Sequence, residues 1–329
     1  MYFMAFINLL VQPVVAAAAA ATTTAYRGYP TSGCGSPAPC IPGTFINSTI
    51  ETNNGSRKFG IWVPENYDYT VETGLIFSYH GANGNISNQR ALDQLTNPEF
   101  NTDYIVAYLQ GVKNSNGSTT WQGAPGAPAD DIAFTNTVLD KIQSQFCVDS
   151  DHIYATGKSQ GAGFVGQQLA CNSKLSARFA AFAPVSGAYY NANITEESDC
   201  KPESMPAPCS PSRTNIPILA FHGGADSTIS YHGGFRKGAC LPDIQYWVRQ
   251  WAQRNGLQAY PSDVHIPGSD GGFTRTYGNG TVMLVYDGDN IPHDWPASFN
   301  NSDNAGHHLT SFNATTWILG FFNDHSLRK

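Results

Sequence analysis

The pentapeptide Gly157-Lys158-Ser159-Gln160-Gly161 matches the pattern G-x-S-x-G. An apolar run at 152–156 precedes it and predicts a strand, and the segment 161–171 that follows predicts a helix. In this setting the pattern predicts a strained turn that lifts the serine hydroxyl above the end of the strand, with the two glycines relieving steric crowding. The alternative is an ordinary strand-to-helix turn. The strand and helix on either side favour Ser159 as a nucleophile.

A serine hydroxyl is a weak nucleophile unless a base takes its proton, so an acid and a histidine are expected in the order Ser, Asp, His. Asp226 is the candidate acid because it follows an apolar strand, 216–221, and a glycine pair. The alternative for Asp226 is a carboxylate that only caps its own loop. Its place at a strand end favours the catalytic role.

Nine histidines compete for the role of base. His293 follows the last predicted strand, 281–286, by a short loop, which is where a base must lie to reach Ser159. Among the competitors, His80 and His222 stand before the acid, His152 heads a strand, and His307 and His308 lie beyond this loop. The sequence therefore predicts His293 as the base, against the alternative of a solvated surface histidine.

The segment His80-Gly81-Ala82-Asn83-Gly84 directly follows a predicted strand at 75–79. Acyl transfer needs backbone N–H groups aimed at the oxyanion that develops on the attacked carbonyl. We expect the amides of Ala82 and Gln160 to form this oxyanion hole. The alternative is a glycine-rich turn that only reverses the chain.

Strands and helices that would position these residues alternate along the chain. The pattern predicts a doubly wound, mostly parallel α/β sheet with helices on both faces. Predicted strands are 58–63, 75–79, 104–109, 152–156, 179–185, 216–221 and 281–286, and predicted helices are 131–146, 161–171, 241–255 and 309–323. The long connection 187–215 shows no clear periodicity, and we expect it to be a flap that faces the substrate.

Composition and motifs exclude several classes of function. The net charge is −7 with 13% charged residues, so no basic patch for nucleic acid is expected. No phosphate-loop or dinucleotide fingerprint is present. The run Asp287-Gly288-Asp289-Asn290 lacks the glycine and the closing glutamate of a calcium loop, since Pro292 stands at the glycine position. We therefore expect neither a metal nor another cofactor.

The N-terminal 1–21 is predicted to be a secretory signal peptide, although a basic start is missing. A membrane anchor is the alternative, but Asn8, Gln12 and Pro13 interrupt its apolar run. We expect a secreted monomer in which 22–329 form one catalytic domain without a carbohydrate-binding module. Sequons for N-glycosylation, which fit secretion, lie at Asn47, Asn54, Asn85, Asn116, Asn193, Asn279, Asn300 and Asn313.

Seven cysteines in a secreted chain predict three disulfides and one free thiol. We expect Cys147 to pair with Cys171 around the nucleophile strand and helix, and Cys200 with Cys209 across the flap. Cys34 with Cys240 would be the third pair, which leaves Cys40 free.

Taken together, these motifs resemble the fungal feruloyl esterases of carbohydrate esterase family 1, close to the group called type D, which have the α/β-hydrolase fold. The likeness covers nearly the whole mature chain and includes the blocks at 78–81, 121–125, 155–159, 181–190, 221–226 and 293–296. Two positions depart from the family pattern: Pro292 replaces an expected glycine, and Gln160-Gly161-Ala162-Gly163 replaces the usual Asn-Gly-Gly-Gly.

The resemblance implies the triad Ser159, Asp226 and His293, and a serine esterase that hydrolyses feruloyl esters on plant cell-wall polysaccharides such as arabinoxylan. A flat phenolic ring needs aromatic or apolar walls. We expect Trp121, Tyr189, Tyr190 and Trp295 to supply them, although each could instead be a core residue. The alternatives are an acetylxylan esterase, a polyhydroxyalkanoate depolymerase, or an inactive carbohydrate-binding protein on the same scaffold.

Overall fold

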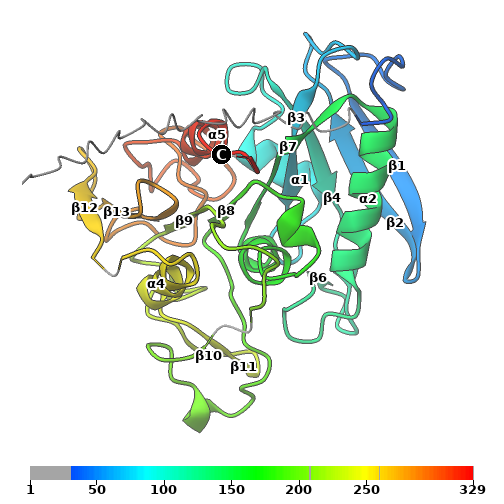
Figure 1. Cartoon of the computed structure of the whole chain (residues 1–329). Helices are drawn as coiled ribbons and strands as arrows, with labels where there is room; N and C mark the ends of the chain where they lie inside the picture. The colour runs from blue at the N-terminus through cyan, green and yellow to red at the C-terminus, as the bar shows by residue number, and fades with distance from the viewer. Residues whose placement is uncertain (1–30, 207–208, 259, 329) are drawn as a thin grey trace, which may run out of the picture.

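A computed structural model describes residues 31–206, 209–258 and 260–328. A ten-stranded sheet forms its centre, in the order β1-β2-β4-β3-β7-β8-β9-β14-β13-β12 (Figure 1). Its strands are β1 (Phe45–Thr52), β2 (Gly55–Trp62), β3 (Thr73–Tyr79), β4 (Tyr104–Leu109), β7 (Val148–Lys158), β8 (Ala181–Val185), β9 (Ile218–His222), β12 (Ser262–His265), β13 (Phe273–Tyr277) and β14 (Val282–Tyr286). Two small hairpins stand apart from the sheet: β5 (Val112–Lys113) with β6 (Thr119–Thr120), and β10 (Gly234–Arg236) with β11 (Ala239–Leu241).

The six central strands, from β4 to β14, are parallel, and the outer strands pair antiparallel. The central strands are almost continuously apolar because both faces of a parallel sheet are covered. All residues of β4, β8 and β9 are buried. The predicted mostly parallel α/β sheet is confirmed, and the carboxyl ends of its central strands meet along one edge.

Helices cover both faces of this sheet (Figure 1). They are α1 (Ile86–Asp93), α2 (Asp131–Gln145), α3 (Gln160–Gly163) running into the π-helix η1 (Phe164–Leu169), α4 (Ile244–Arg254) and α5 (Ala314–Asn323), with short 3-10 turns η2 (Leu175–Ala177) and η3 (Glu197–Asp199). One core cluster joins α2, η1 and α4 to one face of the sheet, and a second joins α1 and α5 to the other. Along β3 the side chains alternate between them, since Leu75, Phe77 and Tyr79 lie in the first and Ile76 in the second.

The predicted elements correspond to β2, β3, β4, β7, β8, β9, β14, α2, α3 with η1, α4 and α5, with shifts of a few residues at their ends. The sequence analysis missed α1 and the outer strands β1, β12 and β13. Helix α1 has only eight residues, and β12 is exposed along its whole length. Short or solvent-exposed elements carry little hydrophobic periodicity, which explains why they escaped notice.

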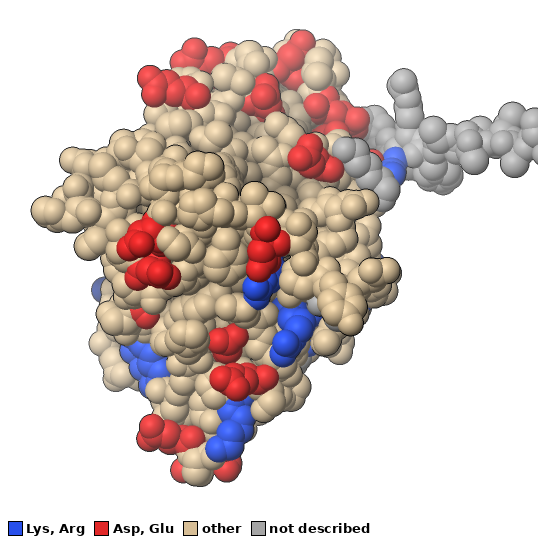
Figure 2. Space-filling view, turned by 90° about the vertical axis from the view of Figure 1, so that its left-hand side faces the viewer, with Lys and Arg blue, Asp and Glu red and all other residues tan. Residues whose placement is uncertain are grey.

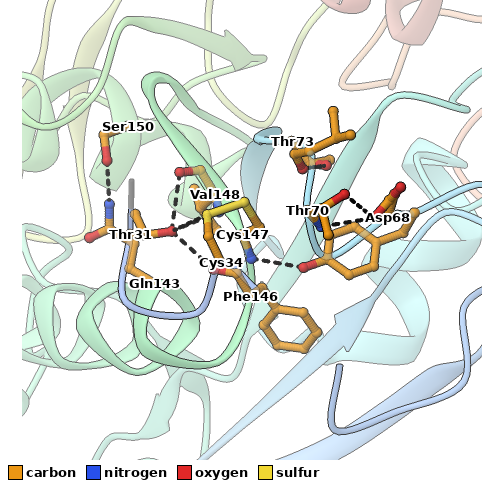
Figure 3. The surroundings of a disulfide bond; sticks show 12 residues. Thr31, Cys34, Asp68, Thr70, Thr73, Gln143, Phe146, Cys147, Val148 and Ser150 are labelled. Atoms are coloured by element: carbon orange, nitrogen blue, oxygen red, sulfur yellow. Dashed lines mark hydrogen bonds between the residues drawn. A yellow bond between two sulfur atoms is a disulfide. The ribbon is translucent and has the colours of Figure 1, made fainter. Parts of the chain in front are cut away.

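The disulfides differ from all three predicted pairs: Cys34 pairs with Cys147, Cys171 with Cys209 and Cys200 with Cys240. Cys147 precedes β7, an eleven-residue strand about 33 Å long, whereas the helical turns after Ser159 return only about 15 Å. Cys171 therefore lies far from Cys147. Figure 3 shows that Cys34 reaches Cys147 instead, where Thr31 also binds the carbonyls of Phe146 and Val148. Cys40 is free, as predicted.

Disulfides anchor the segment 187–215 to other parts of the chain, and none joins two cysteines within the segment. Cys209 joins it to Cys171 after η1, and Cys200 joins it to Cys240 in β11. Asn191 forms a β-bridge with Cys240, which brings that cysteine close to the segment that carries Cys200. The predicted internal Cys200–Cys209 staple is therefore wrong.

The predicted signal peptide, 1–21, lies outside the described residues. Within 31–206, 209–258 and 260–328, no helix is long and apolar enough to cross a membrane. Seven of the eight sequon asparagines are exposed. Asn313 is the exception because it caps α5 and its amide nitrogen has no accessible surface, so we expect it to carry no glycan.

Candidate active site

Ser159 occupies the sharp turn between β7 and α3, with φ 55° and ψ −115°. A non-glycine residue with positive φ is strained and persists only where its surroundings fix it. Hydrogen bonds do so here: the Ser159 amide donates to the Val185 carbonyl at 3.0 Å, and the Ser159 carbonyl accepts from Gly163 and Ala188 at 2.9 and 3.0 Å.

Both glycines of the pentapeptide are required by close approach of the backbone. A Cβ atom on Gly157 would stand 2.7 Å from the carbonyl oxygen of Tyr79, and one on Gly161 only 2.3 Å from the same atom. Such distances are inaccessible to any other residue unless β3 moves. The predicted role of the two glycines in relieving crowding is thereby confirmed.

Asp226 and His293 come together from the loops after β9 and β14. The Nδ1 atom of His293 lies 2.6 Å from Oδ2 of Asp226. The other carboxylate oxygen, Oδ1, accepts hydrogen bonds from the amides of Thr228 and Ile229 at 2.9 and 2.8 Å. The carboxylate therefore holds the imidazole with Nε2 directed away from it.

The electrostatics of this pair keep the acid charged and the base neutral. Burial alone raises the pKa of Asp226, but hydrogen bonds from His222 and His293 outweigh it and hold the pKa well below its ordinary value. Burial lowers the pKa of His293, and the positive charge of Lys158 lowers it further against the opposing effect of Asp226. A neutral imidazole on a charged carboxylate is the state in which a histidine can accept a proton.

Ser159 and His293 line one cavity of about 350 Å³. Nε2 of His293 has no hydrogen-bond partner among the described residues. In unliganded hydrolases the bond between serine and histidine is often long and tightens only around substrate. The free nitrogen and the shared cavity leave His293 able to take the serine proton.

Ala82 lines the same cavity, and Gln160 is the first residue of α3, next to Ser159. The loop that carries Ala82 is fixed by His80: its Nδ1 lies 2.7 Å from the Gly81 carbonyl and its Nε2 accepts from the Gly111 amide at 3.0 Å. Burial lowers the pKa of His80 to about 4, so it stays neutral and acts as a structural residue. Oxyanion binding by the amides of Ala82 and Gln160 stays a prediction.

The four aromatic residues expected around the substrate are all buried, and none lines the cavity of Ser159. Trp121 packs against Tyr79 and donates through Nε1 to the His80 carbonyl at 2.7 Å. Trp295 donates through Nε1 to Thr315. The expectation of an aromatic pocket built from Trp121, Tyr189, Tyr190 and Trp295 is wrong, because these rings fill the core beneath the strand ends.

Tyr189 and Tyr190 belong to the long segment 187–215. Tyr189 stacks on Trp247 of α4 with ring centroids 3.7 Å apart, and the Tyr190 hydroxyl accepts a hydrogen bond from Arg236 at 2.7 Å. No residue of 187–215 lines the cavity. Its expected place over the substrate is taken by the β10–β11 hairpin, which contributes Arg236 and Lys237.

Sequence reasoning gave no role to several residues of this site. His222 lies on the far side of Asp226, with Nε2 3.2 Å from Oδ2 of Asp226 and 2.7 Å from the Ile229 carbonyl. Lys158, the second residue of the elbow, forms a buried ion pair with Asp303. The position of Lys158 next to Ser159 was a signal that could have found it, whereas nothing in the sequence joins Asp303 to the site.

No cluster of histidine, cysteine or carboxylate side chains suited to a metal ion occurs in the part of the chain that the structure describes. Ser159, Asp226 and His293 lie after β7, β9 and β14 of a doubly wound sheet, which is the arrangement of an α/β-hydrolase.

No protein-family model matches the chain. The curated relatives include feruloyl esterase B of Piromyces equi, 28% identical over 219 residues, which cover 65% of this chain and 38% of that protein. Probable feruloyl esterase C of Aspergillus niger is 25% identical over 80% of this chain and 85% of its own length. Feruloyl esterase D of Neurospora crassa is 25% identical over 80% of this chain and 83% of its own. The chain thus spans less than two fifths of the Piromyces protein but most of the other two.

Among solved structures, acetyl xylan esterase from Aspergillus awamori matches with a TM-score of 0.55 and 16% identity, over 76% of this chain and 94% of that one. A thermostable esterase matches with a TM-score of 0.50 and 16% identity, over 86% of this chain and 63% of that one. These likenesses show the fold. The chain is a carboxylic ester hydrolase with the α/β-hydrolase fold. It is a feruloyl esterase-like protein.

Proposed function

We propose that this protein is a secreted serine esterase that hydrolyses feruloyl esters on plant cell-wall polysaccharides such as arabinoxylan. The observation that carries the proposal is the 2.6 Å contact between His293 and Asp226, in which His293 keeps an unpartnered Nε2 and lines the same cavity as Ser159. The names of the curated relatives support the feruloyl substrate. Three disulfides and seven exposed sequons support secretion.

The proposed reaction begins with attack of Ser159 Oγ on the ester carbonyl while His293 takes the hydroxyl proton. The amides of Gln160 and Ala82 bind the oxyanion. His293 then protonates the sugar oxygen as it leaves, and an acyl-serine remains. Water, deprotonated by His293, hydrolyses this intermediate to the carboxylic acid and restores Ser159.

An acetyl ester is the second candidate substrate, because the lining of the cavity favours a small acyl group. The only aromatic rings in that lining are the imidazoles of His80 and His293, and Ala82 and Leu92 are its only apolar side chains apart from the methyl of Thr228. The structural likeness to an acetyl xylan esterase is consistent with this alternative.

The two candidates are separated by measuring release of ferulate, p-coumarate and acetate from defined xylan oligosaccharide esters under one set of conditions. A higher kcat/KM for ferulate supports the feruloyl esterase, and a higher value for acetate replaces it with the acetyl esterase. Failure of all three esters to react, together with failure of a fluorophosphonate probe to label Ser159, would instead indicate an inactive carbohydrate-binding protein.

A further inference from the structure

The cavity at Ser159 adjoins two further pockets. Asn83 and Gly84 line both this cavity and a second pocket of about 510 Å³. Lys58 lines the second pocket and a third of about 690 Å³, which extends to Asn47 on β1. We call the three together the groove. It leads from the cavity of Ser159 to Asn47, Ser48 and Thr49 on the edge strand β1.

The charges along the groove are nearly all positive. Six of the 18 Lys and Arg residues of the chain line it, against one of its 25 Asp and Glu residues, Asp303. The six are Arg57, Lys58, Lys113, Lys158, Arg236 and Lys237. The groove is therefore positively charged, although the net charge of the chain is −7.

Only two of these six cations are neutralised by a carboxylate. Arg57 binds Asp131 at 2.7 Å, and Lys158 binds Asp303. The four others, Lys58, Lys113, Arg236 and Lys237, form no ion pair within the described ranges. Lys58, Lys113 and Lys237 are exposed, and Arg236 is held in place by its hydrogen bond to the Tyr190 hydroxyl.

Some cations elsewhere on the surface form ion pairs with carboxylates. Arg275 binds Asp263, and Arg178 binds Asp140. On the side of the molecule nearest β12 and β13, acidic groups gather at the upper end and basic groups lie beside acidic ones (Figure 2). Lys141, Lys174 and Lys201 outside the groove also form no ion pair within the described ranges. What distinguishes the groove is that its cations gather together with a single carboxylate, Asp303, among them.

We propose that the groove binds an anionic polysaccharide, a chain with uronic acid carboxylates on either side of the esterified sugar. This proposal rests on the proposed function, since it places the scissile ester at Ser159. Four uncompensated cations raise the local concentration of such a chain and orient it. Asn83, Asn85 and Gln110 add amide groups suited to sugar hydroxyls along the second pocket.

The binding test uses electrophoresis of the protein through gels that contain polygalacturonate or neutral arabinoxylan, neither carrying esters. Retardation by polygalacturonate should exceed that by arabinoxylan and should fall as salt rises, because about 1 M salt shortens the screening length to about 3 Å. The double variant K58Q/K113Q should bind polygalacturonate at least about threefold more weakly, the effect expected from losing two exposed ionic contacts.

The matched control is K141Q/K174Q, which removes the same charge at positions outside the groove. Equal loss of binding in both double variants, or no preference of the wild type for polygalacturonate, would overturn the proposal. Asn47 and Asn85 are sequon asparagines that line the groove, so binding is measured before and after enzymatic removal of glycans. If the protein does not prefer polygalacturonate in either state, the proposal is also overturned. Since the probes carry no ester, wild-type protein that binds polygalacturonate yet cleaves no ester would refute the proposed function and leave the groove proposal intact.

Discussion

The two sides of the cavity at Ser159 are built in different ways. On one side, Ser159 directly follows β7, and Asp226 and His293 lie in the loops after β9 and β14, so the parallel sheet places them. On the other side, Arg236 and Lys237 belong to a two-stranded hairpin outside the sheet, tied to the segment 187–215 by the Cys200–Cys240 disulfide and the Tyr190 hydroxyl. Strand ends position Ser159, Asp226 and His293, whereas long-range crosslinks position Arg236 and Lys237.

The largest expected effect is at the nucleophile. Ser159→Ala should reduce kcat by at least about four orders of magnitude, as removal of a triad serine does elsewhere. Thermal unfolding of the variant should match the wild type, which shows that only chemistry is lost. A folded Ser159→Ala enzyme with near-normal turnover would show that the sheet-built side is not catalytic.

Asp226→Asn tests the orientation of the base. The asparagine amide would donate to Nδ1 of His293 and favour the tautomer with a proton on Nε2, so kcat should fall by about 10⁴. The amides of Thr228 and Ile229 can still bind the side-chain oxygen, so the loop should keep its shape. Turnover within tenfold of wild type would mean that the carboxylate does not orient His293.

Trp121→Ala distinguishes a core ring from a substrate wall. Removing this fully buried indole should lower the free energy of unfolding by about 3–5 kcal/mol. Since Trp121 supports the His80 carbonyl, kcat/KM should fall in parallel for methyl ferulate and for an acetyl ester. A loss confined to methyl ferulate would restore the aromatic pocket expected from the sequence.

The hairpin side is tested by replacing both Cys200 and Cys240 with serine. Loss of the disulfide should lower the free energy of unfolding by about 2–4 kcal/mol. Turnover of a small neutral ester should fall less than in either triad variant, because the strand ends are untouched. Peptide mapping of the wild type without reduction provides the control; recovery of a Cys200–Cys209 peptide would contradict the observed pairing.

The smallest effect is on pH dependence. In the proposed mechanism His293 accepts a proton only while it is neutral, so kcat/KM should be lost as pH falls through its pKa. Burial and Lys158 lower that pKa, so the acid limb should lie below the ordinary histidine value of about 6.5. Lys158→Met should move the limb upward, whereas exposed Lys174→Met should not. If the acid limb of the pH profile does not move in Lys158→Met, Lys158 does not lower the pKa of His293.

How much could be predicted from the sequence differs between the two sides of the cavity. The central strands and the meeting of Asp226 with His293 were predictable because hydrophobic periodicity and strand ends are local signals. The disulfides and the burial of Trp121 were not, because they depend on the lengths of elements and on partners tens of residues away. Aromatic residues in glycine-rich loops look exposed in sequence, yet these rings fill space under the strand ends.

The order of the three disulfides along the chain affects how the molecule responds to proteases. A single cut between Cys34 and Cys147, or between Cys171 and Cys240, leaves both fragments covalently joined, because the loops closed by Cys171–Cys209 and Cys200–Cys240 overlap. The unbridged stretch between these protected intervals, 148–170, holds Ser159 and is buried for most of its length. In this stretch, where no crosslink would hold a nicked chain together, packing keeps a protease away from the backbone.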